Sequence, residues 1–478
     1  ERQQAGAVNV LRGSPSGPTA RGDQIWYQSA WGVAGRSERL DQFGSAVASG
    51  DFDRDGFADL VIGVPGEAPS MPIADRPRTR GRAGAVQVIY GSAGGLTTAR
   101  DRLWFQGFGG VPGDRVTSVG FGSALAVGDF DGDGYADVAI GAPGTVVSGL
   151  PGSGQVVILR GSAAGLTAGG AQVWDQTSPG VASEPAAPGE NYMGEWFGNV
   201  LTAGDLDADG RSDLAIGVPF DNRALGAVQV LLGSAAGLTA TGAQYLIGEV
   251  FDPAEPAARE GFGGVLALAD FNGDGRADLA AGRPGATLGV TAKSRGRVSV
   301  VYTGAGGVLR PETAQDWNLE ANFSNNDQAL AWFGEALGCG DFTGDGIADL
   351  AVGASASGVA GFEQDGAVYL LNGSASGLTE TPLVLTQDTP GVPGVQEGLD
   401  AFGMEQLAAA RLSGGSTDWL LVGALNETLG RKTNAGAVTV VPGSPTGVNP
   451  AGSSMWTQAR AGVRGIAEPF DRFGVVSG

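Results

Sequence analysis

The sequence predicts an all-β fold: a seven-bladed β-propeller built from four-stranded antiparallel blades. First, a Phe-Gly pair returns along the whole chain at intervals of 65 to 78 residues, from Phe43-Gly44 to Phe473-Gly474. Second, short Val, Leu and Ile runs alternate with turn signals in a chain that contains 85 glycines. Third, no long stretch has helical periodicity. Four short strands that repeat at a fixed interval are typical of a propeller.

Each complete repeat contains the same four predicted strands in the same order. A strand of small residues follows Phe-Gly and leads into an acidic loop; the second strand ends in Gly-x-Pro. The third begins with a Gly-Ala-Val pattern and ends in Gly-Ser, and the fourth often contains Trp. We place the repeats from residues 43, 121, 197, 262, 333 and 402, with a split blade formed by 473–478 and 1–42. All of them are assigned to one domain, residues 1–478.

The split blade lacks a second strand. Its first strand would be Phe473–Gly478 and its third Ala7–Leu11. Pairing the N- and C-terminal strands within one blade would give a velcro closure. An empty slot would expose backbone donors and acceptors, so we expect it to be filled. Either the natural chain continues past Gly478, or a neighbouring subunit supplies the strand by edge addition.

The acidic loop of the first repeat predicts a cation site. Carboxylates stand at loop offsets 0, 2, 4 and 8, from Asp51 to Asp59, and glycine stands at offset 5. Such a cluster repels itself unless a cation lies among the side chains. Hard oxygen ligands without His or Cys favour Ca²⁺. An EF-hand needs Glu at the twelfth position, where this chain has Ile62, so a β-hairpin loop is expected. The alternative is an acidic surface turn without metal.

Four more repeats carry this loop, which predicts five Ca²⁺ ions in all. The fourth loop has Asn at offset 2 and the fifth has Thr there, both of which can still offer an oxygen. The predicted side-chain ligands are Asp51, Asp53, Asp55, Asp59; Asp129, Asp131, Asp133, Asp137; Asp205, Asp207, Asp209, Asp213; Asp270, Asn272, Asp274, Asp278; and Asp341, Thr343, Asp345, Asp349. The sixth repeat reads Ala410, Leu412, Gly414 and Asp418 at these positions, and no metal is expected there.

The Phe-Gly start, the acidic loop and the Gly-Ala-Pro end of the second strand resemble FG-GAP repeats, and the resemblance covers essentially the whole chain. These repeats build the N-terminal propeller of integrin α subunits and of many bacterial surface or secreted proteins. The resemblance implies a secreted or cell-surface bacterial protein. It also implies that backbone carbonyls complete the five metal sites, those of Phe57, Tyr135, Arg211, Arg276 and Ile347.

Composition excludes several classes of function. A formal net charge of −22 argues against nucleic acid and anionic membrane as partners. No apolar stretch approaches the length of a membrane span. The chain contains no histidine, which removes Ser-His-Asp and Cys-His catalysis. The single cysteine, Cys339, is interpreted as a small core residue. We therefore expect a protein that is not an enzyme.

The leading functional hypothesis is a calcium-stabilised extracellular module for adhesion or binding. Its partner would be a protein or a glycan, recognised by long loops on one face of the propeller, such as Ser178–Trp196 and Gly248–Gly261. The aromatic residues of these loops and their neighbours either stack on a ligand or pack within the fold: Tyr192, Trp196, Phe251 and Trp332. A structural subunit of a bacterial surface assembly and a propeller of a secreted hydrolase or lyase are the alternatives.

Two short motifs are interpreted as having no function. Arg21-Gly-Asp23 matches an adhesive tripeptide, but such a tripeptide arises easily in a chain rich in these residues. The basic segment from Arg76 to Arg82 lies between a second and a third strand. A solvated loop is the interpretation preferred over an anion site.

Overall fold

A computed structural model describes residues 4–30, 32–68, 82–113, 119–182, 194–248, 261–286, 296–322, 331–355, 366–395, 397, 400–412 and 414–474. The chain divides into two compact units. Unit 1 contains Glu1–Val8, Trp26–Asp205 and Asp209–Ile247. Unit 2 contains Asn9–Ile25, Leu206–Ala208 and Gly248–Gly478. Each unit holds three antiparallel sheets of four or more strands, so the predicted all-β propeller of four-stranded sheets is confirmed.

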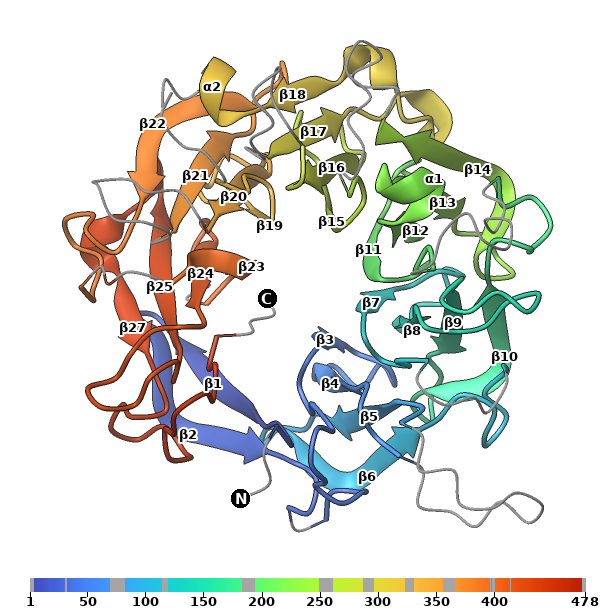
Figure 1. Ribbon diagram of the computed structural model, residues 1–478, viewed down its shortest axis with the longest axis horizontal. Coiled ribbons are helices and arrows are strands. Elements are labelled where there is room, and N and C mark those ends of the chain that lie inside the picture. Colours follow the sequence, from blue (N-terminus) through green and yellow to red (C-terminus); the bar gives the residue numbers. More distant parts are fainter. Residues whose placement is uncertain are drawn as a thin grey trace. The chain divides into compact units, whose positions relative to one another are not determined.

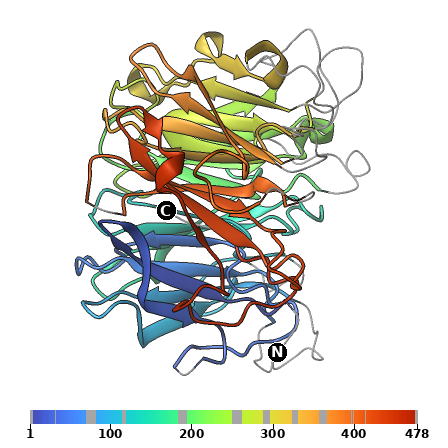
Figure 2. The same cartoon turned by 90° about the vertical axis from the view of Figure 1, so that its left-hand side faces the viewer.

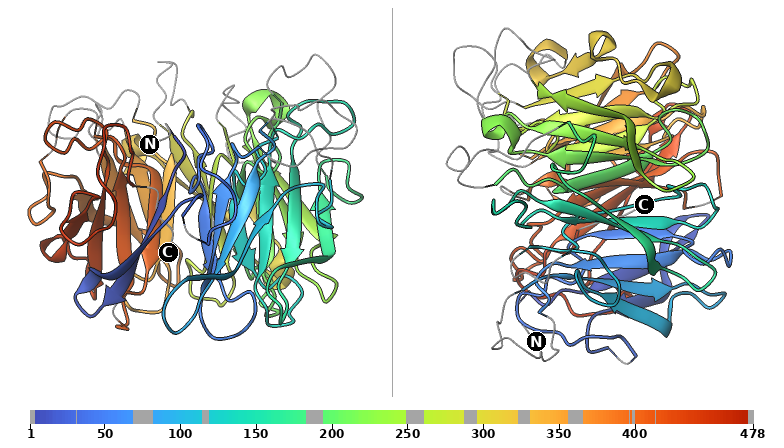
Figure 3. Two further views of the ribbon diagram at one scale, coloured as in Figure 1. Left: turned by 90° about the horizontal axis from the view of Figure 1, so that it is seen from below. Right: turned by 90° about the vertical axis from the view of Figure 1, so that its right-hand side faces the viewer.

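The three sheets of unit 1 follow the repeats that start at residues 43, 121 and 197 (Figure 1). The first contains β3 (Val47–Gly50), β4 (Asp59–Val64), β5 (Ala85–Tyr90) and β6 (Thr97–Trp104). The second contains β7 (Leu125–Gly128), β8 (Asp137–Ala142), β9 (Gln155–Arg160) and β10 (Thr167–Trp174). The third contains β11 (Val200–Gly204), β12 (Asp213–Val218), β13 (Ala227–Leu232) and β14 (Thr239–Ile247), with a one-turn helix α1 (Asp221–Ala224). Figure 3 (right) shows the teal and green strands of the last two sheets lying side by side.

The sheets of unit 2 follow the repeats that start at residues 262, 333 and 402. The fourth sheet contains β15 (Val265–Ala269), β16 (Asp278–Arg283), β17 (Arg297–Val301) and β18 (Gln315–Trp317), and helix α2 (Leu319–Asn322) follows it. The fifth contains β19 (Ala336–Gly340), β20 (Asp349–Ala354), β21 (Ala367–Asn372) and β22 (Thr379–Leu385). The sixth contains β23 (Phe402–Ala410), β24 (Trp419–Ala424), β25 (Ala437–Ser444), β26 (Gly447–Val448) and β27 (Ser454–Trp456).

The middle strands of each sheet are buried on both faces. All six residues of β5 are buried, as are all six of β8 and β12. Strands covered on both sides read as continuous apolar runs and not as an alternating pattern. Consecutive sheets within a unit pack through shared apolar clusters, one of which joins Phe52 and Val88 of the first sheet to Ile140 and Leu159 of the second.

The Phe-Gly pairs link each repeat to the strands before it. Gly84, at the start of the third strand, has a φ of +84° and forms a parallel bridge with Phe121 of the next repeat. A Cβ atom on Gly84 would lie 2.3 Å from the carbonyl oxygen of Phe121, so only glycine fits there. The same bridge joins Gly6 to Phe43, Gly154 to Phe197 and Gly296 to Phe333.

The N-terminal strands form a sheet of their own. Strand β1 (Val8–Ser14) pairs with β2 (Gly17–Trp26) in a two-stranded sheet. Within unit 2, Leu11 and Ala20 of this hairpin pack on a buried cluster that includes Trp419 and Trp456 of the sixth sheet. Figure 2 shows the dark blue hairpin beside the red C-terminal strands.

The prediction of seven blades is wrong, because the described residues form six sheets of four or more strands. Among the described residues, β1 and β2 pair only with each other. Phe473 donates a backbone hydrogen bond to the carbonyl of Ala435, 2.9 Å away, as Phe121 does to Ala83, and lies against Gly436 of the sixth sheet. Residues 475–478 lie outside the described residues, and velcro closure stays a prediction.

Candidate metal centres

Each acidic loop connects the first and second strands of a sheet. In the first repeat, Asp51 follows β3 directly and Asp59 begins β4, opposite Gly50 in the strand register. The carboxylate of Asp51 accepts the backbone N–H groups of Asp55 at 3.0 Å and Gly56 at 2.9 Å. Gly56 has a φ of +89°, which lets the chain turn back over that carboxylate. The loop is therefore closed by its own first residue.

This closure recurs in the other four loops. In each of them, the carboxylate of the first Asp accepts the N–H of the residue at offset 4 and the N–H of the glycine at offset 5. The hydrogen bond from the glycine measures 2.8 Å for Gly134, 2.9 Å for Gly210, 2.8 Å for Gly275 and 3.0 Å for Gly346. An apolar residue at offset 1 anchors each loop in the core. These anchors are Phe52, Phe130, Leu206, Phe271 and Phe342.

The loop geometry gathers three of the four predicted carboxylates in each of the first three repeats. Oxygen atoms of the Asp residues at offsets 0, 2 and 8 all lie within 4.8 Å of one another: Asp51, Asp53 and Asp59; Asp129, Asp131 and Asp137; and Asp205, Asp207 and Asp213. The Asp at offset 4 is not part of this trio. Its carboxylate accepts the backbone N–H at offset 6, at 2.9 Å for Asp55 with Phe57 and for Asp133 with Tyr135.

The fourth and fifth loops keep this fold with fewer carboxylates. Asn272 accepts the N–H of Asp274 through its side-chain oxygen at 2.9 Å, as Asp131 does for Asp133 at 3.2 Å. In the fifth loop the hydroxyl of Thr343 donates to the carboxylate of Asp341 at 3.4 Å. An amide oxygen thus replaces a carboxylate oxygen at loop offset 2 without a change in the turn.

The Asp at offset 8 is buried and holds the loop to its own sheet. Both oxygens of Asp137 accept backbone N–H groups, one from Phe130 at 3.1 Å and one from Gly161 at 2.8 Å. Burial raises the pKa of Asp137 to about 7 and the charges of Asp131 and Asp129 add to this rise, while the two hydrogen bonds oppose it. Burial likewise raises the pKa of Asp59 to about 6, that of Asp278 to about 7 and that of Asp349 to about 6.

These loops suit a hard divalent cation. Clustered carboxylates raise one another's pKa when no cation neutralises them, and a dication among them would favour their charged forms. The donors are all oxygen, and no His or thiol stands among them. That donor set favours Ca²⁺ or Mg²⁺ over transition metals. The predicted carbonyl ligands, at offset 6 of each loop, stay a prediction.

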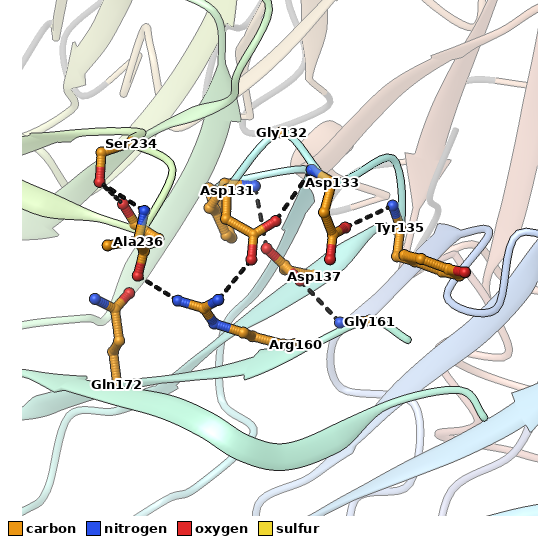
Figure 4. A network of polar contacts seen from close by, with 12 residues as sticks. Asp131, Gly132, Asp133, Tyr135, Asp137, Arg160, Gly161, Gln172, Ser234 and Ala236 are labelled. Atoms are coloured by element: carbon orange, nitrogen blue, oxygen red, sulfur yellow. Dashed lines mark hydrogen bonds and ion pairs between the residues drawn. The ribbon is translucent and has the colours of Figure 1, made fainter. Parts of the chain in front are cut away.

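Two arginines reach carboxylates at loop offset 2. Arg100, on β6, forms an ion pair with Asp53 and stacks on Tyr90, with its guanidinium carbon 4.4 Å from the ring centroid. Arg160, at the end of β9, forms an ion pair of 2.6 Å with Asp131 (Figure 4). Sequence reasoning missed both arginines, because they stand 47 and 29 residues from their partners.

Arg160 also connects its loop to the next sheet. Its guanidinium donates to the carbonyl of Ala236, in the turn between β13 and β14 (Figure 4). Gln172 joins the same turn, accepting the N–H of Leu238 at 2.9 Å and donating to the carbonyl of Leu238 at 2.9 Å. The acidic loop of one repeat is thus linked through the side chain of Arg160 to the turn between the third and fourth strands of the repeat that follows.

Backbone hydrogen bonds make the same link in several repeats. The carbonyl of Asp51 accepts the N–H of Ala136 in the second loop at 3.1 Å, and that of Phe52 accepts the N–H of Ser162 at 3.1 Å. The carbonyls of Asp129, Asp270 and Asp341 accept the corresponding N–H groups of Ser212, Ala348 and Asp418. A loop that is held in place therefore also holds, through these hydrogen bonds, part of the backbone of the next repeat.

The sixth loop has lost its acidic cluster. Its remaining carboxylate, Asp418, forms an ion pair of 2.8 Å with the Nε atom of Arg411 and accepts the N–H of Asp341 at 3.0 Å. Leu412 packs on the apolar cluster of the sixth sheet. A guanidinium group neutralises the carboxylate here, and the prediction that this loop binds no metal stays a prediction.

The predicted ligand loops are only partly described. Tyr192 and Phe251 lie outside the described residues, as do residues 76–81 of the basic segment. Trp196 packs edge-to-face on Phe220 at 4.8 Å, whereas Trp332 is 49% exposed. In the tripeptide at 21–23, Asp23 is 5% exposed and accepts the N–H of Arg464 at 2.6 Å. Among the residues described, no helix is long and apolar enough to cross a membrane.

Comparison with known proteins identifies the repeats. Residues 43–89, 121–159, 197–231, 262–301 and 333–371 match the FG-GAP repeat. Phosphatidylinositol-glycan-specific phospholipase D from Rattus norvegicus is 35% identical over 179 residues, which cover 37% of this chain and 19% of that protein. Integrin alpha-IIb from Homo sapiens is 32% identical over 222 residues, which cover 46% of this chain and 18% of that protein. The chain thus spans about a fifth of the length of these relatives.

A solved structure of a rhamnogalacturonan lyase covers 84% of this chain and 68% of its own, at 14% identity and a TM-score of 0.35, a similarity too low for any inference. The phospholipase is an enzyme by name, so the comparisons do not support the expectation that this chain is not an enzyme. Each of the five matched segments covers the first three strands of one of the first five sheets and ends before its fourth strand. The chain is an all-β propeller protein, and five of its segments match the FG-GAP repeat.

Proposed function

We propose that this protein is a calcium-stabilised extracellular module that binds a protein or a glycan. The observation that carries the proposal is the convergence of three carboxylates within 4.8 Å in each of three successive loops. Each loop is closed by backbone hydrogen bonds and is ready to receive a cation. Five such loops, starting at Asp51, Asp129, Asp205, Asp270 and Asp341, give five Ca²⁺ sites.

The proposed role of the metal is structural. Each loop is tied to its own sheet by a buried Asp, and several are tied to the next repeat through backbone carbonyls. A cation held by such a loop reinforces contacts between repeats. An ion that binds only the folded chain stabilises it by mass action. The metal then maintains the scaffold, and recognition falls to other parts of the surface.

We assign recognition to the long loops that precede the Phe-Gly pairs. Of their aromatic residues, Trp332 is about half exposed and available to a partner, whereas Trp196 packs on Phe220. The match to an integrin α subunit supports an adhesive role at a cell surface or outside the cell. The bacterial setting of this proposal comes from the sequence resemblance. An enzymatic function is the second candidate, supported by the match to the phospholipase.

Chelation tests the structural role of the metal. We expect EDTA to lower the Tm of the protein by several degrees and excess Ca²⁺ to restore it, because carboxylate repulsion returns when the cation leaves. Asp131→Ala should reduce the EDTA-sensitive part of the Tm, while Asp388→Ala, an exposed change outside the loops, should not. An unfolding curve that EDTA leaves unchanged would exclude the structural role.

A further inference from the structure

A cleft of about 680 Å³ opens in unit 2 beside the fourth acidic loop. Its walls are that loop, the connection between β17 and β18, and the turn Ala375–Gly377 of the fifth sheet. Its volume lies within the range of small-molecule sites. No sequence motif that we singled out predicts it.

The fourth repeat departs from the others at this cleft. In the first, second, third and fifth repeats, a Ser after the third strand donates its hydroxyl to the carbonyl of a glycine three residues later, at 2.6 or 2.7 Å; these residues are Ser92, Ser162, Ser234 and Ser374. The fourth repeat has Gly304 at this position and continues through two 3-10 turns, Ala305–Gly307 and Pro311–Thr313. Its fourth strand, β18, has three residues, as does β27 of the sixth repeat, whereas β6 and β10 have eight. The altered connection forms one wall of the cleft.

The cleft contains two guanidinium groups in a chain with a net charge of −22. Arg276 stands in the acidic loop, with its Nη1 atom 3.3 Å from a carboxylate oxygen of Asp274. Its Nε atom is buried and has no hydrogen-bond partner among the described residues. Arg310 is exposed, and no ion pair to it is found in the part of the chain that the structure describes. Its backbone N–H donates to the carbonyl of Tyr302 at 3.0 Å.

The base of the cleft is held by hydrogen bonds between the fourth and fifth sheets. The hydroxyl of Tyr302 donates to Gln315, and both side chains accept the N–H of Leu378, at 2.8 and 3.1 Å. Around this base, Thr313 donates its hydroxyl to the carbonyl of Arg310 at 2.8 Å and Ser376 shares a hydrogen bond of 3.1 Å with Ser374, so each oxygen can still accept a hydrogen bond. Asn272 and Asp274 also line the cleft, and its other lining residues are small. Such a surface offers hydrogen-bonding groups and charge beside the apolar atoms of Tyr302 and two alanines.

We propose that this cleft binds an acidic saccharide, whose carboxylate or sulfate group lies between Arg276 and Arg310. A guanidinium fork matches the paired oxygens of either anion. The hydroxyls of Thr313 and Ser376 then suit the hydroxyl groups of a sugar. None of the residues that line the cleft belongs to the long loops Ser178–Trp196 and Gly248–Gly261 to which recognition is assigned above. The proposal rests in part on the proposed metal, because a cation in the fourth loop would neutralise part of the negative charge of Asp274.

Binding measured by calorimetry at saturating Ca²⁺ tests the site. The probes are a uronic acid trisaccharide, a sulfated trisaccharide, neutral maltotriose and a hexaglutamate peptide. We expect one or both acidic sugars to bind, with an affinity that falls as salt is raised, and maltotriose not to bind. The two acidic probes distinguish a carboxylate from a sulfate ligand. Stronger binding of hexaglutamate than of either sugar, or no binding of either sugar, would overturn the proposal.

Arg310→Ala is the decisive variant, because Arg310 is exposed and lies outside the metal loop. It should weaken binding of the acidic sugar about tenfold or more, the loss expected for one charge-assisted contact. Arg276→Ala should do the same. Arg211→Ala, at the equivalent position of the third loop, is the control and should leave affinity within about twofold. Unchanged affinity of Arg310→Ala would refute the site. Counting bound Ca²⁺ in every variant separates a failure of this cleft from a failure of the proposed metal sites.

Discussion

At the scale of single residues, charge compensation decides what each acidic loop does. Asp131 and Asp53 face arginines, Asp418 of the sixth loop faces Arg411, and the buried Asp at offset 8 is held by backbone N–H groups. The acidic ligands themselves could be predicted from sequence, because their spacing is local. Their arginine partners could not, because they approach only when the strands pair.

Arg160 should compete with a cation for Asp131. Arg160→Ala removes the guanidinium and its bond to Ala236, so we expect the metal-free protein to lose about 1 kcal/mol of unfolding free energy. Calcium affinity of the second loop should rise several-fold, because Asp131 no longer has a competing partner. Urea unfolding in EDTA and a calcium titration measure the two effects. Arg160→Lys, which keeps the charge, should show a smaller gain in affinity; an equal gain would argue against competition.

Two buried glutamates should make stability depend on pH. Burial raises the pKa of Glu67 to about 7, and that of Glu427 to about 7, from an ordinary value of 4.5; Gln28 and Gln387 oppose the rise by donating hydrogen bonds of 2.6 Å. The folded state then holds these protons more tightly than the unfolded state does. This tighter proton binding stabilises the folded state. Its contribution to the free energy of unfolding is complete below pH 4.5 and is lost as the pH rises through 7.

The expected result is a free energy of unfolding that falls between pH 5 and pH 8, by up to about 3 kcal/mol for each group. Glu67→Gln should remove its share of that fall, whereas the exposed change Glu380→Gln should not. Urea unfolding at several pH values, with calcium saturating, provides the measurement. A Glu67→Gln variant with the same pH dependence as the parent would contradict this account.

At the scale of strands and loops, glycine and phenylalanine set the contacts between repeats. The order of the strands could be predicted because each has its own end signal, such as Gly-x-Pro after the second. The reason for the glycine at the start of the third strand could not be predicted, because this glycine contacts the Phe-Gly pair of the next repeat, which is distant in sequence. The altered connection of the fourth repeat also escaped prediction, since an irregular segment has no periodicity to read.

Gly84→Ala tests that contact. The added Cβ atom would lie 2.3 Å from the carbonyl oxygen of Phe121, at a φ of +84° that alanine rarely adopts. We expect a loss of about 3 kcal/mol or more in unfolding free energy, measured by urea denaturation. Gly94→Ala is the matched control, because its nearest atom is 3.7 Å away. It should change stability by less than about 0.5 kcal/mol, and equal losses in the two variants would contradict the contact.

At the scale of the whole molecule, the number of sheets formed by the described residues differs from the number of Phe-Gly pairs in the sequence. Seven Phe-Gly pairs predicted seven blades, but the described residues form six sheets and a separate hairpin. The seventh pair resembles the others in its local contact, since Phe473 lies against Gly436 as Phe121 lies against Gly84. A Phe-Gly pair therefore marks the end of one sheet as well as the start of the next. Counting pairs overestimates the sheets by one.

The central claim, that the acidic loops hold calcium, is tested most directly by counting the ions. Native mass spectrometry of the calcium-loaded protein should show five Ca²⁺ ions per chain, and Asp129→Asn should remove one of them. The first Asp both closes its loop and offers a ligand oxygen, so its loss empties one site and leaves four. Two or fewer ions in calcium-replete buffer would contradict the account.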